Sequence, residues 1–390
     1  MEQQGKGQWG SSFGFLMAAV GSAVGLGNLW GFPYKMGANG GFAFLLLYLV
    51  LVVFVGYVIL VTELALGRKT GKGVVGAYTD LSKKYTFIGW MSAIAPWLIL
   101  SFYSMLGGYC IKYAIANLGD LFGASWGING ADSGAFFGEF TTNMGQTVIF
   151  SLIFVLLTII IVRGGVSGGI EKFTSVAMPA LFIMLVITII RSVTLPGAAA
   201  GLEFMFKPDW SAFQGTGWIT VLSVAGGQMF FSLSLGMSIM VAYGSYLPKT
   251  ENLEKSALII PFADTIVAIM AGLATMPAVF ASGLEPSAGP GLLFITLQTV
   301  FQSMGGFGPL FGFLFSGLVF IAAISSSISL LEGITAVAVD KMEEKGKQVN
   351  RNKLVMILGA SIAVTASIIS IDGLGANGFP QFLAQGCWLD

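Results

Sequence analysis

One ionisable side chain interrupts a strongly apolar stretch of this sequence. Asp264 lies in the run PFADTIV. An ionised carboxylate is costly in hydrocarbon, so we expect it to face a partner in the protein interior. A sodium ion would be one such partner, because hard cations prefer oxygen ligands; a bound proton, or a position nearer water at a helix end, would be others. Asn28, Gln228 and Ser232 are candidate neighbours that would supply further polar groups.

A run of hydroxyl side chains lies in another apolar stretch, IAAISSSISLL, at Ser325, Ser326 and Ser327. Serine hydroxyls within a helix usually hydrogen-bond to their own helix, and that is the simpler interpretation. The same hydroxyls could bind sodium if free backbone carbonyls lie beside them. Tyr103 also allows two interpretations. Its side chain either packs as an ordinary aromatic residue, or its phenol donates a hydrogen bond to a substrate carboxylate.

The segment that could supply free carbonyls runs from Gly21 to Pro33 and reads GSAVGLGNLWGFP. Each glycine costs about 1 kcal/mol relative to alanine inside a helix, so this cluster favours a break. Open backbone at membrane depth is tolerated only where it is buried in protein, lines a cavity or binds a ligand. Freed carbonyls suit a cation, and the N-terminus of a half-helix suits a carboxylate. Close helix packing through small residues is the alternative.

A second interrupted segment reads GGQMFFSLSLG, from Gly226 to Gly236. Ser232 and Ser234 together with Gly236 could unwind that helix near the middle of the membrane. Paired broken helices at corresponding positions indicate a transporter built from inverted repeats. We therefore expect a single transmembrane domain over residues 1–390, with a first repeat at about 9–194 and a second, incomplete repeat at about 214–390.

The composition indicates an all-α, polytopic membrane protein. The 390 residues are 55% hydrophobic and only 10% charged, whereas a soluble protein has about 25% charged residues. The net charge of zero does not suggest nucleic acid, the absence of histidine excludes a histidine site, and two cysteines form no disulfide framework. The sequence predicts about nine spans, near 13–36, 41–67, 88–116, 146–163, 173–194, 214–246, 256–281, 309–339 and 353–371.

The distribution of lysine and arginine predicts the orientation. Basic residues precede the first span and occupy every second connection after it, whereas residues 118–145 contain none. This places the N-terminus in the cytoplasm of a multi-pass plasma-membrane protein surrounded by lipid, and no cleavable signal pattern is present. The external segment 283–308 has an apolar middle at 292–301, which is either a short helix acting as a lid or a plain structured loop.

The motifs occur in an order that resembles the neurotransmitter:sodium symporter family, most closely its bacterial amino-acid members with the LeuT fold. In order they are GSAVGLGNLWGFP, NGGFAF, ELALGR, GGQMFFSLSLG and the serine run. The resemblance implies a LeuT-type inverted five-helix repeat with broken first and sixth helices. It also implies sodium-coupled symport of an amino acid into the cytoplasm by alternating access, with two sodium ions, no organic cofactor and no enzyme activity. A non-transporting, sodium-dependent amino-acid-binding membrane protein is the alternative.

The resemblance also assigns roles to individual residues. The first sodium site would use Ala23, Asn28, Ser232 and Asp264 together with the substrate carboxylate. The second would use the carbonyls of Gly21, Val24 and Ala322 and the hydroxyls of Ser325 and Ser326. The substrate pocket would be formed by Ser22, Ala23, Leu26, Gly27, Ile99, Tyr103, Phe231, Ser232, Ser234, Met237, Ser326 and Leu330. Its apolar lining favours a hydrophobic or aromatic amino acid.

Two positions discriminate within that family. Monoamine transporters have an aspartate where this chain has Gly25, so the substrate here should bring its own carboxylate. Chloride-dependent members have a neutral residue at the position of Asp264. Tyr48, Gln228 and Ser232 match the halide-site pattern, but Asp264 would supply the negative charge, so we expect chloride-independent transport.

The cytoplasmic gate of the family would correspond to Lys6, Trp9 and Asp340, and Gly169 with Pro179 matches the site where the fifth helix unwinds. Two departures stand out. Gly31 replaces the arginine of the external gate, so the outer ion pair cannot form. The chain also ends at Asp390, before the family's tenth span, so we expect it to be truncated after the ninth.

Overall fold

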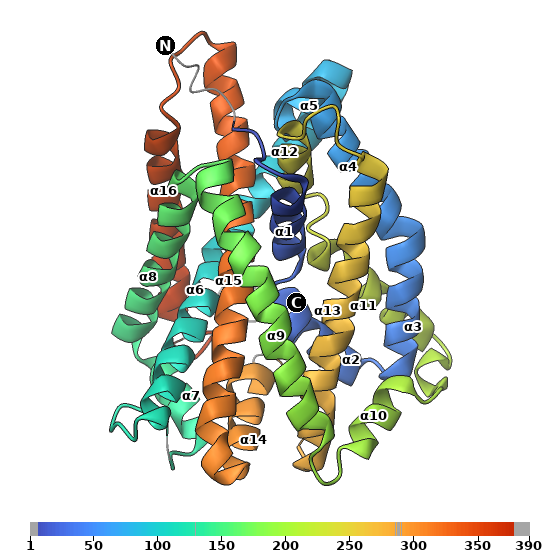
Figure 1. Ribbon diagram of the computed structural model, residues 1–390, viewed down its shortest axis with the longest axis vertical. Helices are drawn as coiled ribbons and strands as arrows, with labels where there is room; N and C mark the ends of the chain where they lie inside the picture. Colours follow the sequence, from blue (N-terminus) through green and yellow to red (C-terminus); the bar gives the residue numbers. More distant parts are fainter. Residues whose placement is uncertain (1–6, 129, 285, 287–288, 290, 378–390) are drawn as a thin grey trace.

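The computed structural model describes residues 7–128, 130–284, 286, 289 and 291–377, and this part of the chain is helical without strands (Figure 1). Its α-helices are α1 (Ser12–Ala23), α2 (Phe32–Ala38), α3 (Phe42–Leu51), α4 (Tyr57–Thr70), α5 (Val74–Leu81), α6 (Thr86–Leu121), α7 (Ser133–Thr142), α8 (Met144–Arg163), α9 (Lys172–Val193), α10 (Ala199–Phe206), α11 (Gly217–Ser232), α12 (Ile239–Ser245), α13 (Leu253–Ala281), α14 (Leu297–Ser303), α15 (Gly308–Glu344) and α16 (Arg351–Asp372). Four π-helical turns adjoin them: η1 (Gly27–Gly31), η2 (Val52–Gly56), η4 (Val166–Glu171) and η6 (Leu292–Thr296).

The predicted spans coincide with these helices. Within the described residues, seven helical stretches are long and apolar enough to cross a membrane, and the bent pair formed by α1 and η1–α2 makes an eighth. The sixth predicted span is divided between α11 and α12, which have 16 and 7 residues, so neither half is long enough to cross alone. The all-α fold with broken first and sixth helices is therefore confirmed.

The first break lies at Val24 and Gly25. Helix α1 ends at Ala23, Val24 has extended backbone (φ −77°, ψ 96°), and the helix resumes through η1 at an angle of 46°. A Cβ on Gly25 would lie 2.3 Å from the Ser326 hydroxyl, so this glycine also allows α15 to approach closely. Both interpretations of the glycine cluster, a break and close packing, are thus correct at this point.

The second break follows Ser232. Ser234, Gly236 and Ser238 have φ values of 55°, 73° and 67°, in the left-handed region that stops a right-handed helix. The amide of Gly236 donates to Glu63 Oε1 on α4 at 2.7 Å, which satisfies one of the freed backbone groups. Serine, with its short polar side chain, tolerates this geometry because the surrounding structure supplies hydrogen-bond partners.

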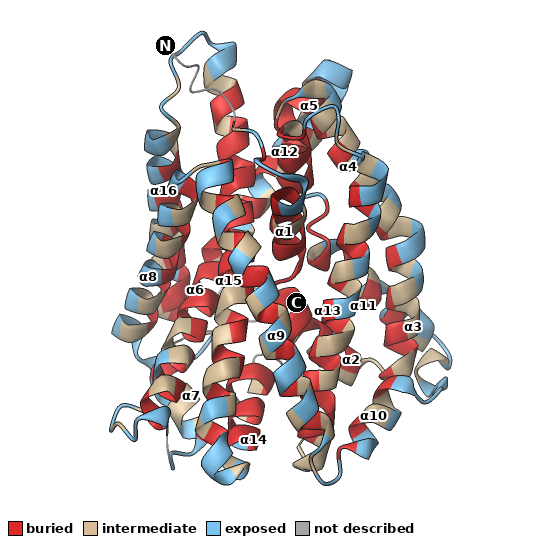
Figure 2. Cartoon of the chain, in the orientation of Figure 1, coloured by how far each residue is buried: buried red, intermediate tan, exposed pale blue. Residues whose placement is uncertain are grey.

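Helix α1 lies near the centre of the bundle, against α9, α13 and α15, while α3 and α8 lie at opposite sides (Figure 1). Burial follows this arrangement, since α1 and much of α15 are buried and the outward faces of α3, α8 and α16 are exposed (Figure 2). Large apolar side chains are exposed on several outer segments, including Phe54 in η2, Ile160 on α8, Val176 on α9 and Val364 on α16. An apolar surface of this kind fits a lipid environment.

The two ends of the bundle differ. The start of α1, α5 and the connection between α15 and α16 lie at one end, and α7, α10 and α14 lie at the other (Figure 1). In the segment 283–308 the apolar middle does form a helix, from Leu292 to Ser303, whose apolar side chains are mostly buried. The side-chain amides of Gln298 and Asn117 donate to one another at 3.1 Å, which attaches this helix to α6.

Candidate functional site

Asp264 is fully buried at the centre of a polar cluster that joins four helical segments. Asn28 Nδ2 donates to its Oδ1 at 2.7 Å, and the Ser232 hydroxyl lies 3.0 and 2.9 Å from its two oxygens. The hydroxyl of Tyr48 on α3 donates to Oδ2 at 3.1 Å. The structure therefore confirms Asn28 and Ser232 as neighbours of Asp264 and adds Tyr48, which the sequence had indicated only through the halide-site pattern.

The side chain of Asn28 connects this cluster to the first break. Its amide nitrogen faces Asp264, and its Oδ1 accepts a hydrogen bond from the amide of Gly25 at 3.3 Å. Gln228, in contrast, has no hydrogen bond to Asp264. It donates to the Gly27 carbonyl at 2.7 Å instead, and its Oε1 has no partner within the described part of the chain. Of the three candidate neighbours, Gln228 is therefore the one that forms no hydrogen bond with Asp264, because its side-chain amide is bonded to η1.

A second set of oxygen atoms lies where α15 meets the first break. The hydroxyl of Ser325 is 3.5 Å from the Val24 carbonyl and 2.9 Å from the Ala322 carbonyl. The hydroxyl of Ser326 is 3.5 Å from the Gly21 carbonyl. These five predicted residues do come together. Ser325 and Ser327 both donate to their own helix, at Ala322 and Ile324, as the simpler interpretation predicts; Ser325 also approaches the first break, whereas Ser327 bonds Thr158.

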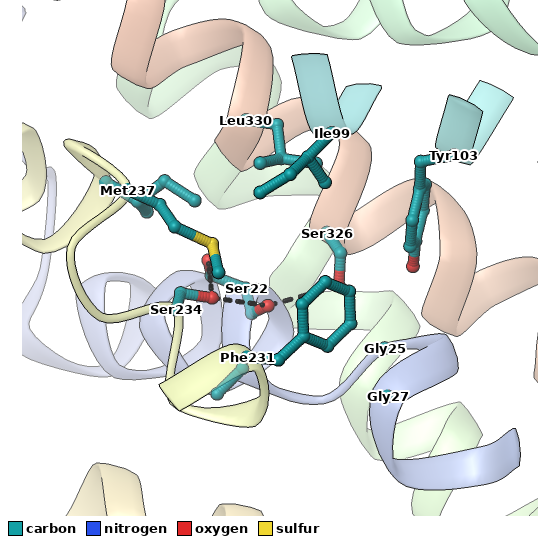
Figure 3. A pocket seen from close by; sticks show the side chains of 12 residues that line it. Ser22, Gly25, Gly27, Ile99, Tyr103, Phe231, Ser234, Met237, Ser326 and Leu330 are labelled. Carbon is teal, nitrogen blue, oxygen red and sulfur yellow. Dashed lines mark hydrogen bonds between the residues drawn. The ribbon is translucent and has the colours of Figure 1, made fainter. Parts of the chain in front are cut away.

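A pocket lies between the two broken segments (Figure 3). Its polar side includes Ser22 and Ser234, whose hydroxyls are 3.2 Å apart, and Ser326, which donates to the Ser22 carbonyl at 3.1 Å. Its apolar side is formed by Ile99, Met237 and Leu330, which converge in Figure 3. The complete lining is Ser22, Ala23, Gly25, Gly27, Ile99, Tyr103, Phe231, Ser234, Met237, Ile239, Ser326 and Leu330.

Most of the predicted substrate residues therefore line one cavity, with two exceptions. Ser232 faces Asp264 rather than the pocket, and Leu26 lines a second cavity on the other side of Phe231. The amide of Leu26 still reaches the site, because it donates to the Tyr103 hydroxyl at 3.2 Å. Gly25 and Ile239 line the pocket in addition. Ile239 belongs to no motif, so its apolar side chain alone does not mark it as a pocket residue. Its position just after the second break is the signal that could have indicated its place in the lining.

The second cavity lies between the pocket and the end of the molecule that carries α14. Trp30, Gly31 and Gln228 line it, and it shares Tyr103 and Phe231 with the pocket. A Cβ on Gly31 would lie 3.3 Å from Gln228 Oε1, a buried acceptor that has no hydrogen-bond partner within the described residues. The Trp30 indole donates to the Gly289 carbonyl at 2.8 Å, which links η1 to the connection before η6.

The opposite end holds the predicted cytoplasmic gate. Lys6 lies outside the described residues, so its pairing with Asp340 stays a prediction. Trp9 is buried, packs edge-on against Tyr243 and donates to the Tyr243 carbonyl at 3.1 Å. Asp340 is also buried and accepts a hydrogen bond from the Gly73 amide.

A buried ion pair lies near this gate. Glu332 on α15 is fully buried and pairs with Arg351 at the start of α16. The second carboxylate oxygen of Glu332 accepts a hydrogen bond from the Tyr246 hydroxyl at 2.8 Å. Glu332 thus connects α15 both to the end of α12, through Tyr246, and to the start of α16, through Arg351.

Gly169 lies in the irregular turn η4, ten residues before Pro179 within α9. A Cβ at Gly169 would lie 2.0 Å from the carbonyl of Ile161, so the turn packs directly against the end of α8. The backbone is therefore already irregular at the position where the sequence predicts unwinding.

Comparisons with known proteins agree with this geometry. A sequence profile of the sodium:neurotransmitter symporter family matches residues 6–127 and 132–383. An uncharacterized sodium-dependent transporter of Bacillus subtilis, YhdH, is 39% identical over 378 residues, which cover 95% of this chain and 81% of that protein. A second uncharacterized sodium-dependent transporter, from Haemophilus influenzae, is 35% identical over 389 residues, covering 97% of this chain and 80% of the relative.

A solved structure is also similar. The structure of MhsT in complex with L-phenylalanine superimposes with a TM-score of 0.86 at 40% identity, and covers 95% of this chain and 82% of that one. The family consists of transporters rather than enzymes. The chain therefore belongs to the sodium:neurotransmitter symporter family and is a multi-pass, sodium-dependent symporter with the LeuT-type fold.

Proposed function

We propose that this protein carries a hydrophobic or aromatic amino acid into the cytoplasm together with sodium, and that transport does not require chloride. The observation that carries the proposal is the position of the pocket. It lies between the two helix breaks, next to the Asp264 cluster on one side and the Ser325–Ser326 cluster on the other. A ligand bound there would contact both sets of oxygen atoms or the residues that hold them.

The first sodium ion would bind at the Asp264 cluster. Asp264, Ser232 and the Oδ1 atom of Asn28 are oxygen donors suited to a hard cation. The Ala23 carbonyl and the substrate carboxylate would complete the shell. Because the substrate would itself be a ligand of this ion, each would raise the affinity for the other by the same factor.

The second sodium ion would bind between Gly21, Val24 and Ala322, which would offer carbonyls, and Ser325 and Ser326, which would offer hydroxyls. Its donors are neutral, in contrast to the first site. Since they belong to α1 and α15, an ion between them would hold these two helices together. Loss of that ion would weaken the contact between α1 and α15.

The amino-acid substrate would lie across the breaks. Its carboxylate would meet the amides of Leu26 and Gly27, which belong to the start of a half-helix and so carry partial positive charge. The Tyr103 hydroxyl already lies on the Leu26 amide and would donate to the same carboxylate. The substrate ammonium would meet Ser234 and the carbonyls of Ala23, Phe231 and Ser232.

The substrate side chain would face Ile99, Met237 and Leu330, with Ile239 nearby. This lining is apolar, and methionine adapts its shape to different ligands. The L-phenylalanine in the MhsT structure supports the same substrate class for this chain. Gly25 supplies no acidic group, so a ligand without its own carboxylate would leave the first sodium with Asp264 as its one charged ligand.

Chloride independence would follow from Asp264. The hydroxyls of Tyr48 and Ser232 and the amide of Asn28 all donate to its carboxylate, so the donors that could hold a halide are already used by a fixed negative charge. A chloride ion there would be repelled by Asp264.

Alternating access would require the two ends to open in turn. The basic connections share one end of the bundle with Trp9 and Asp340, and we assign that end to the cytoplasm of the plasma membrane. Lys6, Trp9 and Asp340 would form the inner gate, and Phe231 with Tyr103 would separate the pocket from the outer cavity. The two repeats, at about 9–194 and 214–390, would supply the moving and fixed parts.

Uptake into proteoliposomes tests the proposal. Radiolabelled L-phenylalanine should accumulate with an inward sodium gradient, should not accumulate with potassium, and should enter at the same rate when gluconate replaces chloride. Uptake stimulated by chloride at fixed sodium would contradict the chloride-independent mechanism.

Gly31 favours one alternative, a protein that binds the amino acid without transporting it. Gly31 lines the outer cavity without a side chain that could close it, and the buried Oε1 of Gln228 beside it has no hydrogen-bond partner among the residues that the structure describes. Sodium-dependent binding of L-phenylalanine without accumulation in the same vesicles would support that alternative.

A further inference from the structure

Three glycines at the start of the described chain all face one turn of another segment. A Cβ on Gly7 would lie 3.2 Å from the Val166 side chain. A Cβ on Gly10 would lie 3.3 Å from both carboxylate oxygens of Glu171, and one on Gly14 would overlap that side chain at 2.0 Å. The N-terminal segment and the first turn of α1 therefore run directly along η4, at a distance that larger side chains would prevent.

Glu171 uses this close approach to bind α1. Its Oε2 accepts a hydrogen bond from the Gly10 amide and its Oε1 accepts one from the Ser11 hydroxyl, both at 2.7 Å. Ser11 is the N-cap of α1 and accepts from the Gly14 amide at 2.9 Å. A negative charge at this end of a helix is favourable, because the first backbone amides carry partial positive charge.

We propose that Glu171 is an inner-gate residue that ties the cytoplasmic end of α1 to η4, so that movement of α1 and unwinding of η4 occur together. The inference rests on the alternating-access function proposed above. Glu171 is the last residue of η4 and lies two residues after Gly169. Helix α1 begins after its N-cap, Ser11, and ends before Val24. The carbonyls of Gly21 and Val24, at this far end of the helix, face the Ser325–Ser326 cluster.

This connection has a mechanical consequence. While Glu171 binds Gly10 and Ser11, the start of α1 is held against η4. When η4 unwinds, Glu171 is carried away from Gly10 and Ser11, and α1 loses both hydrogen bonds at once. A hydrogen bond to a charged group contributes more than a neutral one, so loss of the pair should favour the open arrangement by about tenfold.

A second carboxylate on α1 provides a matched control. Ser12 donates to Glu251 Oε2 at 2.5 Å, and Ser256 donates to Glu251 Oε1 at 2.9 Å. Glu251 precedes α13, which is already joined to the first break through Asn28 and Asp264. Removing the Glu251 side chain therefore deletes a comparable contact of α1 without freeing it from η4.

Pulsed electron paramagnetic resonance on the full chain tests the proposal. Spin labels at Gln8→Cys and Asn352→Cys, both exposed positions, would report the distance between the N-terminal segment and the start of α16 in nanodiscs with saturating sodium. Cys110 and Cys387 are replaced by alanine beforehand. The variants are Glu171→Ala, Gly14→Ala, the combination of both, and Glu251→Ala.

The distance distribution separates a closed population, in which α1 lies against η4, from a displaced population, in which α1 has moved away. We expect Glu171→Ala to raise the ratio of the displaced to the closed population about tenfold. Gly14→Ala should have a similar effect, since its methyl group displaces the Glu171 side chain, and the double variant should add little. Glu251→Ala should leave the ratio near that of the parent. An unchanged ratio in both Glu171→Ala and Gly14→Ala, or an equal rise in Glu251→Ala, would overturn the proposal. If either variant fails to fold, the other carries the test alone.

Failure of the proposed function can be recognised separately. Absence of sodium-driven L-phenylalanine uptake by the parent protein would refute the transport proposal. The ratio of displaced to closed populations, measured in sodium without amino acid, would still decide whether Glu171 ties α1 to η4.

Discussion

Asn28 and Asp264 are 236 residues apart in the sequence, yet the Asn28 amide donates to the Asp264 carboxylate at 2.7 Å. This hydrogen bond joins the first helix break to α13. The oxygen of the same side chain, Asn28 Oδ1, accepts a hydrogen bond from the backbone amide of Gly25 within the break. One asparagine thus holds the buried carboxylate and the opened backbone in a fixed relation, as a cation shared between them would require.

Replacing Asp264 by asparagine should weaken the first sodium site. The variant keeps the size of the side chain but removes the only charged group of the cluster, so the sodium concentration for half-maximal binding should rise about tenfold or more. Chloride should now support binding, because the donors from Tyr48 and Ser232 would face no fixed charge. Sodium titration of thermal stability with chloride or gluconate measures both effects, and unchanged sodium dependence would remove Asp264 from this role.

Replacing Tyr103 by phenylalanine should weaken amino-acid binding without affecting the fold. The phenol would donate to the substrate carboxylate, and a hydrogen bond to a charged group corresponds to about a tenfold to hundredfold change in Kd. Calorimetric titration with L-phenylalanine in sodium gives the affinity, while the unfolding temperature without ligand serves as the control. Full affinity in the variant would mean that the phenol serves only as an acceptor for the Leu26 amide and does not bind the substrate.

Replacing Gly25 by alanine should block the pocket. The new methyl group would lie 2.3 Å from the Ser326 hydroxyl and 3.0 Å from that of Tyr103, so one of these would have to move. We expect at least about tenfold weaker binding of L-phenylalanine. Gly227→Ala is the matched control, because a Cβ there would meet nothing within 4 Å. Equal affinities of the two variants would contradict the placement of the substrate beside Gly25.

Replacing Ser325 by alanine should impair the second sodium site. The variant removes one hydroxyl from a set of neutral ligands, and we expect about a tenfold higher sodium requirement for uptake. Ser327→Ala is the control, since that hydroxyl bonds its own helix and Thr158. If Ser327→Ala raised the sodium requirement as much as Ser325→Ala, the hydroxyls would be acting through helix packing.

Replacing Arg351 by leucine should destabilise the protein. Glu332 would stay buried without its cationic partner, and breaking a buried pair in this way costs about 3–5 kcal/mol. Lys341→Leu is the control, because its pair with Glu344 is partly exposed to solvent and surface pairs contribute about 0–1 kcal/mol. Urea or thermal unfolding in detergent measures the difference, and equal stability of the two variants would contradict this account of the Glu332–Arg351 pair.

Much of the fold and most of the candidate site could be predicted from the sequence, for a physical reason. Breaks in apolar helices are expensive, so glycine clusters at 21–31 and 226–236 indicate where backbone opens, and polar side chains at that depth must find one another. This reasoning placed Asp264 with Asn28 and Ser232. It did not anticipate the partner of Gln228, whose side-chain amide donates to the Gly27 carbonyl freed at the first break.

Contacts that depend on close approach between distant segments could not be predicted. The Glu171 carboxylate binds Gly10 and Ser11, but no periodicity in the sequence relates residues 160 positions apart. Ile239 is a different case, because its apolar side chain gives no signal of its own but its position directly after the left-handed residue Ser238, at the second break, could have indicated its place in the pocket.

The most direct test of the central claim compares L-phenylalanine with L-phenylalaninamide, which lacks the carboxylate, in sodium and in potassium. If the substrate carboxylate is a ligand of the first sodium ion, L-phenylalanine should stabilise the purified protein against thermal unfolding only in sodium, and the amide should not stabilise it in either salt. Equal stabilisation by both compounds, or by L-phenylalanine in potassium, would contradict the coupling of substrate and sodium through a shared site.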